Sequence, residues 1–169
     1  MKEGGGKRPI WAPWRIEYIR SEKDGGCFIC AAAAAPESDD ASNLLVLRGE
    51  TCLVVMNRYP YNPGHLLVSP YRHVADIADL TADERLETMD LLAEAKRILS
   101  ETMSPDGFNI GFNLGLVAGA GLEDHIHAHI VPRWNGDTNF MPVLDGSRVV
   151  PEALDATWEM LVDAWTRRG

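Results

Sequence analysis

The stretch that decides the fold reads His125-Ile126-His127-Ala128-His129-Ile130-Val131. Successive side chains of an extended strand point to opposite faces of a sheet. The three histidines therefore share one face, about 6.6 Å apart at a rise of about 3.3 Å per residue. The aliphatic residues between them turn to the other face, where a core would bury them. Lys, Thr or Glu would serve equally well on a merely solvated face, so a row of imidazoles predicts a chemical role for this strand.

The length and charge of the chain limit its class. At 169 residues it has the size of one domain, which buries about two-thirds of the surface that its unfolded chain exposes. Hydrophobic residues make up 46% of the chain and can supply that core. The formal net charge of −9 argues against a general nucleic-acid binder or membrane-surface binder, because such proteins carry a basic face. A small anionic substrate stays compatible with this charge, since a pocket can be locally positive.

Residues 1–24 are interpreted as an N-terminal arm ahead of a core at residues 25–169. The arm begins rich in Gly and Lys and has no apolar segment of the signal-peptide type. Within it, Trp11 to Ile19 has mixed helical spacing, with Pro13 where a first helical turn accepts proline. Three cysteines, an odd number, do not indicate a secreted disulfide framework, and no apolar run reaches the ~18 residues of a membrane span. We therefore expect a cytoplasmic protein that binds neither nucleic acid nor a membrane.

Further strands are predicted upstream of the histidine strand. Leu44 to Leu47 and Cys52 to Met56 are expected to form a hairpin, and His65 to Val68 a third strand. Phe108 to Gly115 alternates strictly between large apolar residues and Asn or Gly. The residues expected to face the core are Phe108, Ile110, Phe112 and Leu114. Because glycine weakens a strand, its presence on the opposite face suggests that something else lies against that face.

Two helices are predicted. Thr81-Ala82-Asp83-Glu84 is a capping box that starts a helix ending near Met103. Pro151 to about Arg167 is predicted to be a closing amphipathic helix. The first helix is expected to pack through Leu86, Met89, Leu92 or Ala93, the stem of Lys96, and Leu99, and the second through Leu154, Trp158, Leu161 and Trp165. Between the first cysteines and the hairpin, the polar segment Pro36 to Ser42 is expected to be a flexible link.

Two short motifs are candidate binding sites. Cys27-Phe28-Ile29-Cys30 follows two glycines, and a tight turn there would let both thiolates bind one metal ion. A redox pair and two reduced core thiols are the alternatives. A closed zinc site would need two more ligands, and spacing alone does not select them from the five histidines. The loop Gly119-Ala120-Gly121 exposes backbone N–H groups that suit an anion, so Gly119 and Gly121 are candidate substrate-binding residues.

The histidine strand resembles the signature of the histidine triad (HIT) family, His-x-His-x-His with hydrophobic residues between and after. The segment Asn57 to Pro70, with its Pro63-Gly64-His65, resembles the upstream active-site segment of that family. Similarity extends to Trp11 to Tyr18, Gly107 to Gly115 and Val131 to Asp137. Together these segments resemble a bacterial branch related to diadenosine tetraphosphate phosphorylases. The resemblance implies an α+β fold in which residues 1–169 form a single HIT domain. It further implies a mainly antiparallel sheet of about five strands with helices on one face.

The resemblance also implies a catalytic mechanism. His127 would attack the α-phosphorus of a dinucleoside polyphosphate such as diadenosine tetraphosphate. The covalent nucleotidyl-histidine would then be resolved by water, phosphate or another acceptor. His129 and His65 would flank the phosphate. Asn113 would contact the phosphate and Asn57 the ribose side.

In zinc-bearing relatives the metal ligands map onto Cys27, Cys30, His73 and His125, and this assignment uses every remaining histidine once. A site closed by four protein ligands has no open position for catalysis, so the zinc would be structural. Relatives usually form homodimers by pairing their sheets edge to edge, and a homodimer is expected here.

The chain departs from part of the family at Gly121, where hydrolases of the fragile histidine triad branch carry Gln. This departure leaves phosphorolysis or another transfer open. His129 stands where galactose-1-phosphate uridylyltransferases carry Gln, which disfavours a uridylyltransferase. The leading hypothesis is a nucleotidyl transferase or hydrolase. The alternatives are a nucleoside phosphoramidase, a nucleotide-binding or sensor protein with incidental turnover, and a zinc-stapled interaction module.

Overall fold

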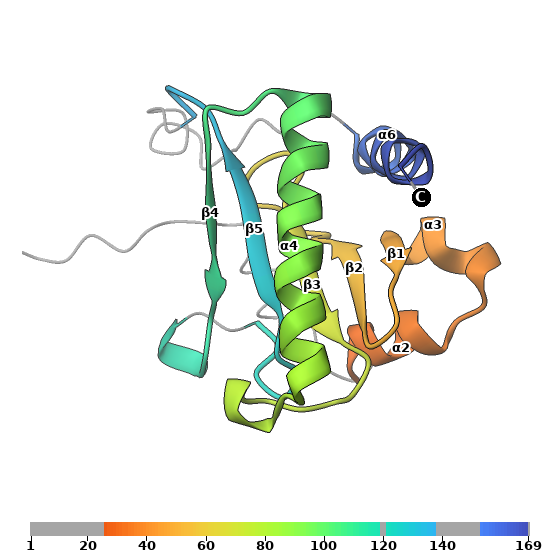
Figure 1. The fold of residues 1–169 in the computed structure, drawn as a ribbon, viewed down its shortest axis with the longest axis vertical. Coiled ribbons are helices and arrows are strands. Elements are labelled where there is room, and N and C mark those ends of the chain that lie inside the picture. Colours follow the sequence, from red (N-terminus) through yellow and green to blue (C-terminus); the bar gives the residue numbers. More distant parts are fainter. Residues whose placement is uncertain (1–25, 119–120, 138–152, 169) are drawn as a thin grey trace, which may run out of the picture.

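The computed structural model describes residues 26–118, 121–137 and 153–168. Within these ranges five strands form one sheet in the order β1-β2-β3-β5-β4, with every neighbouring pair antiparallel (Figure 1). The strands are β1 (Leu45–Arg48), β2 (Cys52–Met56), β3 (Leu66–Pro70), β4 (Gly107–Phe112) and β5 (Ala128–Arg133). The predicted α+β class and the hairpin are confirmed. The histidine strand is shorter than predicted, because β5 begins at Ala128, so that His125 and His127 precede it and His129 lies within it. β4 forms one edge of the sheet.

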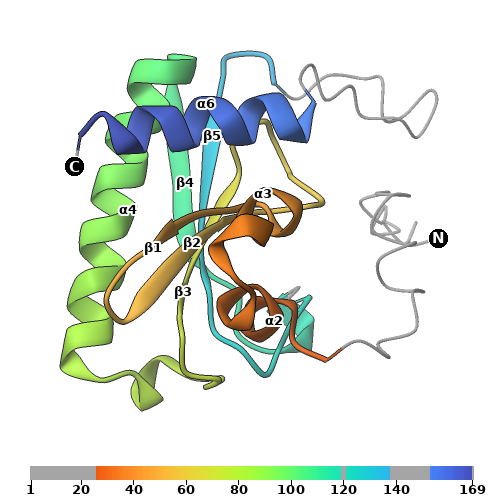
Figure 2. The ribbon, with the colours of Figure 1, turned by 90° about the vertical axis from the view of Figure 1, so that its right-hand side faces the viewer.

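Helices cover both faces of this sheet. α4 (Ala82–Met103) packs on one face, and α6 (Leu154–Thr166) contacts both α4 and the edge strand β1. The short helix α2 (Phe28–Ala34) lies on the opposite side of the sheet from α4 (Figure 2). The expectation of helices on one face is therefore wrong for α2. The remaining helical turns are η1 (Glu37–Asp39), α3 (Asp40–Asn43), η2 (Ile77–Asp79) and η3 (Leu116–Ala118).

The alternation of the histidine strand determines which side chains enter the core. Ala128 and Ile130 are fully buried in the cluster that includes the α4 residues Ile98 and Leu99. His129 points to the other face, and Gly111 of β4 is its partner in the sheet. The face of β5 away from α4 therefore carries His129, and the Asn and Gly residues of β4 share this face, as the alternation predicts.

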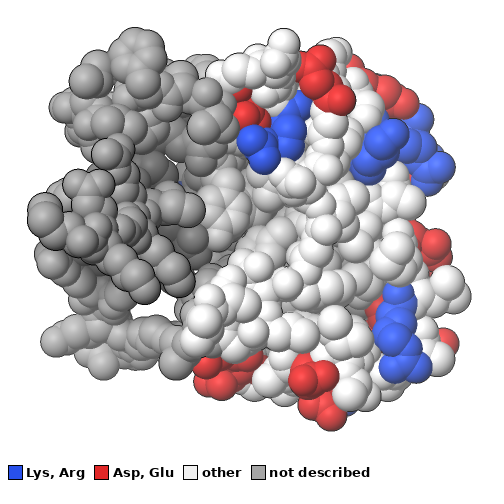
Figure 3. All heavy atoms as spheres, turned by 90° about the vertical axis from the view of Figure 1, so that its left-hand side faces the viewer, with Lys and Arg blue, Asp and Glu red and all other residues white. Residues whose placement is uncertain are grey.

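The opposite face of β4 is less buried than expected. Ile110 is 50% exposed and Leu114 is 42% exposed, so the prediction that they face the core is wrong. Phe108 and Phe112 are partly buried at the margin of the core. The cause is position, because an edge strand has a neighbour on one side only. Figure 3 views the molecule from this side, where charged residues gather at the margins of the described surface.

Helix α4 begins at the predicted capping box but packs through a different stripe. Leu86 is 64% and Met89 is 61% exposed, so their assignment to the core is wrong. The buried stripe is Glu84, Thr88, Leu91, Leu92, Ala95, Ile98 and Leu99. The first turns of this stripe can bury polar side chains because each of these side chains has a polar partner. Arg72 binds the Glu84 carboxylate at 2.7 Å and lowers its pKa to about 2, while the Thr88 hydroxyl lies 3.5 Å from the Cys52 thiol.

The segment Pro36 to Ser42 is not a loop, which corrects the expectation of a flexible link there. It forms η1 and the start of α3. Asp40 binds Arg48 of β1 at 2.7 Å. The Arg48 guanidinium also donates to the carbonyls of Ala32, Ala33 and Ala35 at 3.2, 3.0 and 2.9 Å. This one side chain therefore ties the end of α2 and the following turns to the sheet.

The closing helix is confirmed over Leu154–Thr166. Leu161 and Trp165 are buried, and Trp158 donates its indole N–H to the Leu45 carbonyl at 2.8 Å. The expected arm at residues 1–24 and its helix at Trp11 to Ile19 lie outside the described residues. No helix in the described ranges combines the length and apolar composition that a membrane span requires.

Candidate functional site

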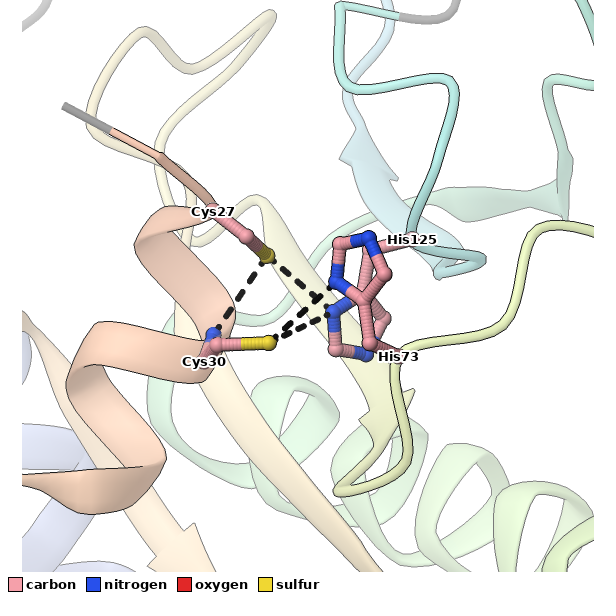
Figure 4. A group of neighbouring side chains, drawn as sticks. All are labelled: Cys27, Cys30, His73 and His125. Atoms are coloured by element: carbon pink, nitrogen blue, oxygen red, sulfur yellow. Dashed lines mark hydrogen bonds between the residues drawn. The ribbon is translucent and has the colours of Figure 1, made fainter. Parts of the chain in front are cut away.

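Four predicted metal ligands converge from three distant parts of the chain (Figure 4). The ligand atoms of Cys27, Cys30, His73 and His125 all lie within 4.8 Å of one another. Cys27 is the N-cap of α2, and its thiol accepts a hydrogen bond from the Cys30 N–H at 3.4 Å. The pair therefore lies at the first turn of a helix rather than in the tight turn expected. His73 follows β3 and His125 precedes β5.

The histidine rings direct their Nδ1 atoms at the thiols. The Nδ1 of His125 lies 3.1 Å from the Cys27 sulfur and 3.5 Å from the Cys30 sulfur, and the Nδ1 of His73 lies 3.3 Å from the Cys30 sulfur. The Nε2 of His125 donates to the Pro70 carbonyl at 2.9 Å, which leaves the lone pair on Nδ1. Such a second hydrogen bond orients most metal-binding histidines. Two thiolates and two imidazoles are a ligand set of structural zinc sites.

His127 lies two residues beyond His125, in the segment that leads into β5. Its Nδ1 donates to the His125 carbonyl at 2.8 Å, so the lone pair of a neutral ring is on Nε2. The ring is 7% exposed, and this burial lowers the pKa of His127 below its ordinary value. A neutral imidazole with its Nε2 lone pair available can attack an electrophilic phosphorus at pH 7.

His65 and His129 form a hydrogen-bonded pair beside this nitrogen. The backbone N–H of Tyr61 donates to the Nδ1 of His65 at 3.2 Å, so a neutral His65 carries its proton on Nε2. That Nε2 lies 2.9 Å from the Nδ1 of His129, which therefore accepts. The proton of a neutral His129 is then on Nε2, and the side-chain nitrogen of Asn113, itself a donor, lies 3.4 Å from that atom. The pair places the His129 ring next to that of His127, with ring centroids 4.9 Å apart.

A cavity of about 300 Å³ opens beside these rings. His127 and His129 line it together with Asn57 and Gly121, two of the predicted substrate-binding residues. The walls include the apolar residues Phe28, Leu44, Val55 and Leu122 and the polar residues Arg58 and Tyr59. A mainly apolar pocket with a few polar groups at a reactive centre suits a nucleoside. Gly119, the other predicted anion-binding glycine, lies outside the described residues.

Sequence reasoning missed the supports of this site. The Tyr61 ring stacks on His65 with ring centroids 5.0 Å apart. Asn62 is buried and donates to the Pro132 carbonyl and to Asp137, both at 2.8 Å. A turn-rich segment gives no signal that its tyrosine stacks on a histidine or that its asparagine is buried. Asp137 forms an ion pair with Arg133 at 2.5 Å, and a spacing of four residues indicates such a pair only on a helix, whereas Arg133 ends a strand.

The comparison with known families agrees with this geometry. The family model described as HIT domain matches residues 39–136, which span β1 to β5 and all the predicted catalytic histidines. The chain belongs to the HIT domain family. The AP-4-A phosphorylase of Mycobacterium tuberculosis is 40% identical over 165 residues, covering 94% of this chain and 85% of that protein.

Two other similar HIT proteins are informative. The bis(5'-adenosyl)-triphosphatase of Dictyostelium discoideum is 39% identical over 87 residues, covering 50% of this chain and 56% of that protein. Among solved structures, a Zn-bound histidine triad family protein from Mycobacterium smegmatis superimposes with a TM-score of 0.65 at 26% identity. It covers 85% of this chain and 95% of that chain. The HIT fold predicted from the histidine strand is therefore confirmed.

The HIT segment Pro63-Gly64-His65 allows a prediction about Gly64. Its φ is +72°, and a Cβ there would lie 2.6 Å from the Met103 sulfur and 2.9 Å from a Leu99 methyl carbon. Gly64→Ala should lower the free energy of unfolding by about 1–3 kcal/mol, measured by chemical denaturation. Gly107→Ala is the matched control, because a Cβ at Gly107 meets nothing within 4 Å, and it should change stability by less than about 0.5 kcal/mol. Equal effects of the two substitutions would contradict this account.

Proposed function

We propose that this chain transfers a nucleotidyl group from a dinucleoside polyphosphate, such as diadenosine tetraphosphate, to an acceptor through a covalent intermediate on His127. The observation that carries the proposal is the hydrogen bond from the His127 Nδ1 to the His125 carbonyl at 2.8 Å, which leaves the Nε2 lone pair at the cavity. The similarity to the AP-4-A phosphorylase over 94% of the chain supports this substrate class.

The proposed first step is attack by the His127 Nε2 on the α-phosphorus. A phosphorus–nitrogen bond forms, the bond to the bridging oxygen breaks, and its electron pair leaves with the nucleoside polyphosphate. The Nε2–H of His129, held by His65, is the hydrogen-bond donor for the phosphate group or the leaving oxygen. Asn113 is proposed to contact the phosphate, and Asn57 the ribose side in the apolar cavity. Gly119 and Gly121 remain proposed substrate contacts.

In the second step an acceptor oxygen attacks the same phosphorus. The phosphorus–nitrogen bond breaks and its electron pair returns to the Nε2 of His127. Inorganic phosphate as acceptor yields a nucleoside diphosphate, and water yields a nucleoside monophosphate. The relative named a phosphorylase, at 40% identity, favours phosphate as the acceptor.

The covalent intermediate is the direct test of this function. After rapid mixing with diadenosine tetraphosphate and acid quenching, peptide mass spectrometry should find one AMP attached to His127. His127→Ala should carry no adduct and should lose at least about 10³-fold in turnover, because the nucleophile is gone. Full turnover by His127→Ala, or an adduct on another residue, would contradict the proposal. A wild-type chain that binds the nucleotide without an adduct or turnover would instead favour a nucleotide-binding protein.

We also propose that Cys27, Cys30, His73 and His125 bind structural zinc. The support is the Cys₂His₂ ligand set and the Nδ1 lone pair of His125 aimed at the sulfurs. Zinc bound there would fix the segment ahead of β5 that carries His127, with both cysteines in their reduced form. A cytoplasmic location, in which thiols stay reduced, fits this site.

The zinc proposal predicts a selective loss of metal. Purified wild-type protein should contain one zinc per chain by elemental analysis, and Cys30→Ser should lose most of it and melt at a lower temperature. Cys52→Ser is the matched control. Cys52 is fully buried against Thr88 and Glu84 and lies outside the cluster, so this variant should keep its zinc. Equal zinc content in the two variants would contradict the assignment.

A homodimer formed by pairing the edges of two sheets is the proposed assembly. The support is the position of β4 at the end of the sheet, with its Ile110 side chain 50% exposed. An unpaired edge strand offers backbone N–H and C=O groups to a second copy.

The assembly predicts a dimer in size-exclusion chromatography with light scattering. Ile110→Asp places a charge at the proposed interface and should shift the population toward the monomer. Met89→Asp, on the exposed side of α4, is the control for an added charge and should leave the dimer intact. A monomeric wild-type chain would rule out this assembly.

A further inference from the structure

A second cavity, of about 400 Å³, lies on the histidine face. It is separate from the nucleoside pocket, the cavity of about 300 Å³ beside His127. The two cavities share only Tyr61 and His129 among their described lining residues. His127 lines the nucleoside pocket but not the second cavity, whereas Asn109, Gly111 and Arg133 line the second cavity but not the nucleoside pocket. The hydrogen-bonded His129 therefore stands at the boundary between a pocket that contains His127 and a pocket that extends away from it.

The second cavity is open because β4 lacks a side chain next to His129. Gly111 is the sheet partner of His129, and a Cβ added at Gly111 would meet no atom of the described residues within 4 Å. Its φ lies outside the left-handed region, so the backbone conformation does not require glycine. A side chain is compatible with this backbone but would stand in the cavity. Glycine at this position leaves space in the cavity. Gly64 is different, because its positive φ requires glycine.

The lining of the cavity is polar and close to electrically neutral. Arg133 donates to the two Asp137 carboxylate oxygens at 2.5 and 2.8 Å, and to the Asn109 side-chain oxygen at 2.7 Å. Asp137 thus balances the charge of Arg133, the one cationic residue of the described lining. Amide and guanidinium N–H groups can hydrogen-bond phosphate oxygens. A lining without excess positive charge binds a polyanion weakly enough for it to leave.

We propose that this cavity binds the group that lies across the reacting phosphorus from His127, which is the leaving group in the first step and the acceptor in the second. This inference rests on the function proposed above. The cavity would hold the phosphate chain of the nucleoside polyphosphate as its bond to the α-phosphorus breaks. After departure, inorganic phosphate would enter the same space and attack the phosphorus as the bond to the His127 nitrogen breaks. A volume of about 400 Å³ is within the usual range of ligand pockets. Gly111, Asn109 and Arg133 would then decide which leaving groups and acceptors fit.

Filling the cavity tests the proposal. Gly111→Val should reduce kcat/KM for diadenosine tetraphosphate, measured with inorganic phosphate present, at least 10-fold. The second substrate is adenosine 5'-phosphoramidate with water as acceptor, whose leaving group is ammonia and needs no large subsite. The loss on diadenosine tetraphosphate should exceed the loss on the phosphoramidate at least 10-fold. Valine is favoured in strands and glycine weakens them, so the melting temperature should not fall.

Gly107→Val is the matched control. Gly107 lies on the same strand and face, a Cβ there also meets nothing within 4 Å, and the residue does not line the cavity. Its kinetics should match the wild type on both substrates. Equal losses on the two substrates for Gly111→Val, or no loss on diadenosine tetraphosphate, would overturn the subsite. A wild-type chain inactive on both substrates would instead refute the proposed function.

Asn109→Asp provides a second test that does not depend on steric filling. The carboxylate keeps an oxygen that can accept from Arg133 but adds a negative charge to the lining. The KM for inorganic phosphate should rise at least 5-fold at low salt, and the rise should shrink as ionic strength increases. An unchanged KM for phosphate would overturn the assignment, even if Gly111→Val failed to fold.

Discussion

The histidine face depends on the hydrogen bonds and contacts of one residue, His125. Its Nε2 donates to the Pro70 carbonyl, its Nδ1 faces the two thiols, and its own carbonyl accepts from the Nδ1 of His127. The first contact ties β5 to the end of β3, the second ties it to α2, and the third sets the tautomer of His127. Rotation of the His125 ring would break the first two contacts, whereas the third depends on the position of the His125 backbone. The histidine row is therefore a junction in which His125 orients its neighbour and the remaining two rings face the cavities.

The sheet and its two faces could be predicted because a strand has a period of two residues. The alternation of β5 requires only that one side be buried, and Ile130 and His129 lie accordingly. The same reasoning failed for Ile110, since alternation cannot show that a strand lies at an edge. It also failed for Leu86 and Met89, because the buried side of α4 begins with Glu84, whose burial depends on Arg72. Apolar periodicity does not detect a buried polar residue whose partner is distant in sequence.

The candidate site was predictable to the extent that its residues stand in short motifs. Cys27 and Cys30 were recognisable as a candidate metal-binding pair, but the choice of His73 needed the family resemblance, because only the fold brings the end of β3 to the start of α2. Tyr61 and Asn62 left no pattern, although they fix the rings and the end of β5. Tyr61 acts through its backbone N–H and its stacked ring, and Asn62 acts through its side-chain amide, whose partner Pro132 is distant in sequence. Long-range contacts of this kind are a property of the packed chain, not of local spacing.

The net charge of −9 can be reconciled with a polyanionic substrate by the composition of the two cavities. Their described cationic lining residues are Arg58 and Arg133. Arg58 donates to the Ser42 carbonyl, and Arg133 is paired with Asp137. The groups nearest the proposed reacting centre are imidazoles and side-chain amides, whose directed N–H groups can bind phosphate oxygens without a net positive charge from Lys or Arg. Such a site needs no basic surface to attract its substrate. It also releases charged products without having to separate strong ion pairs, which suits an enzyme that exchanges one polyanion for another at a single phosphorus.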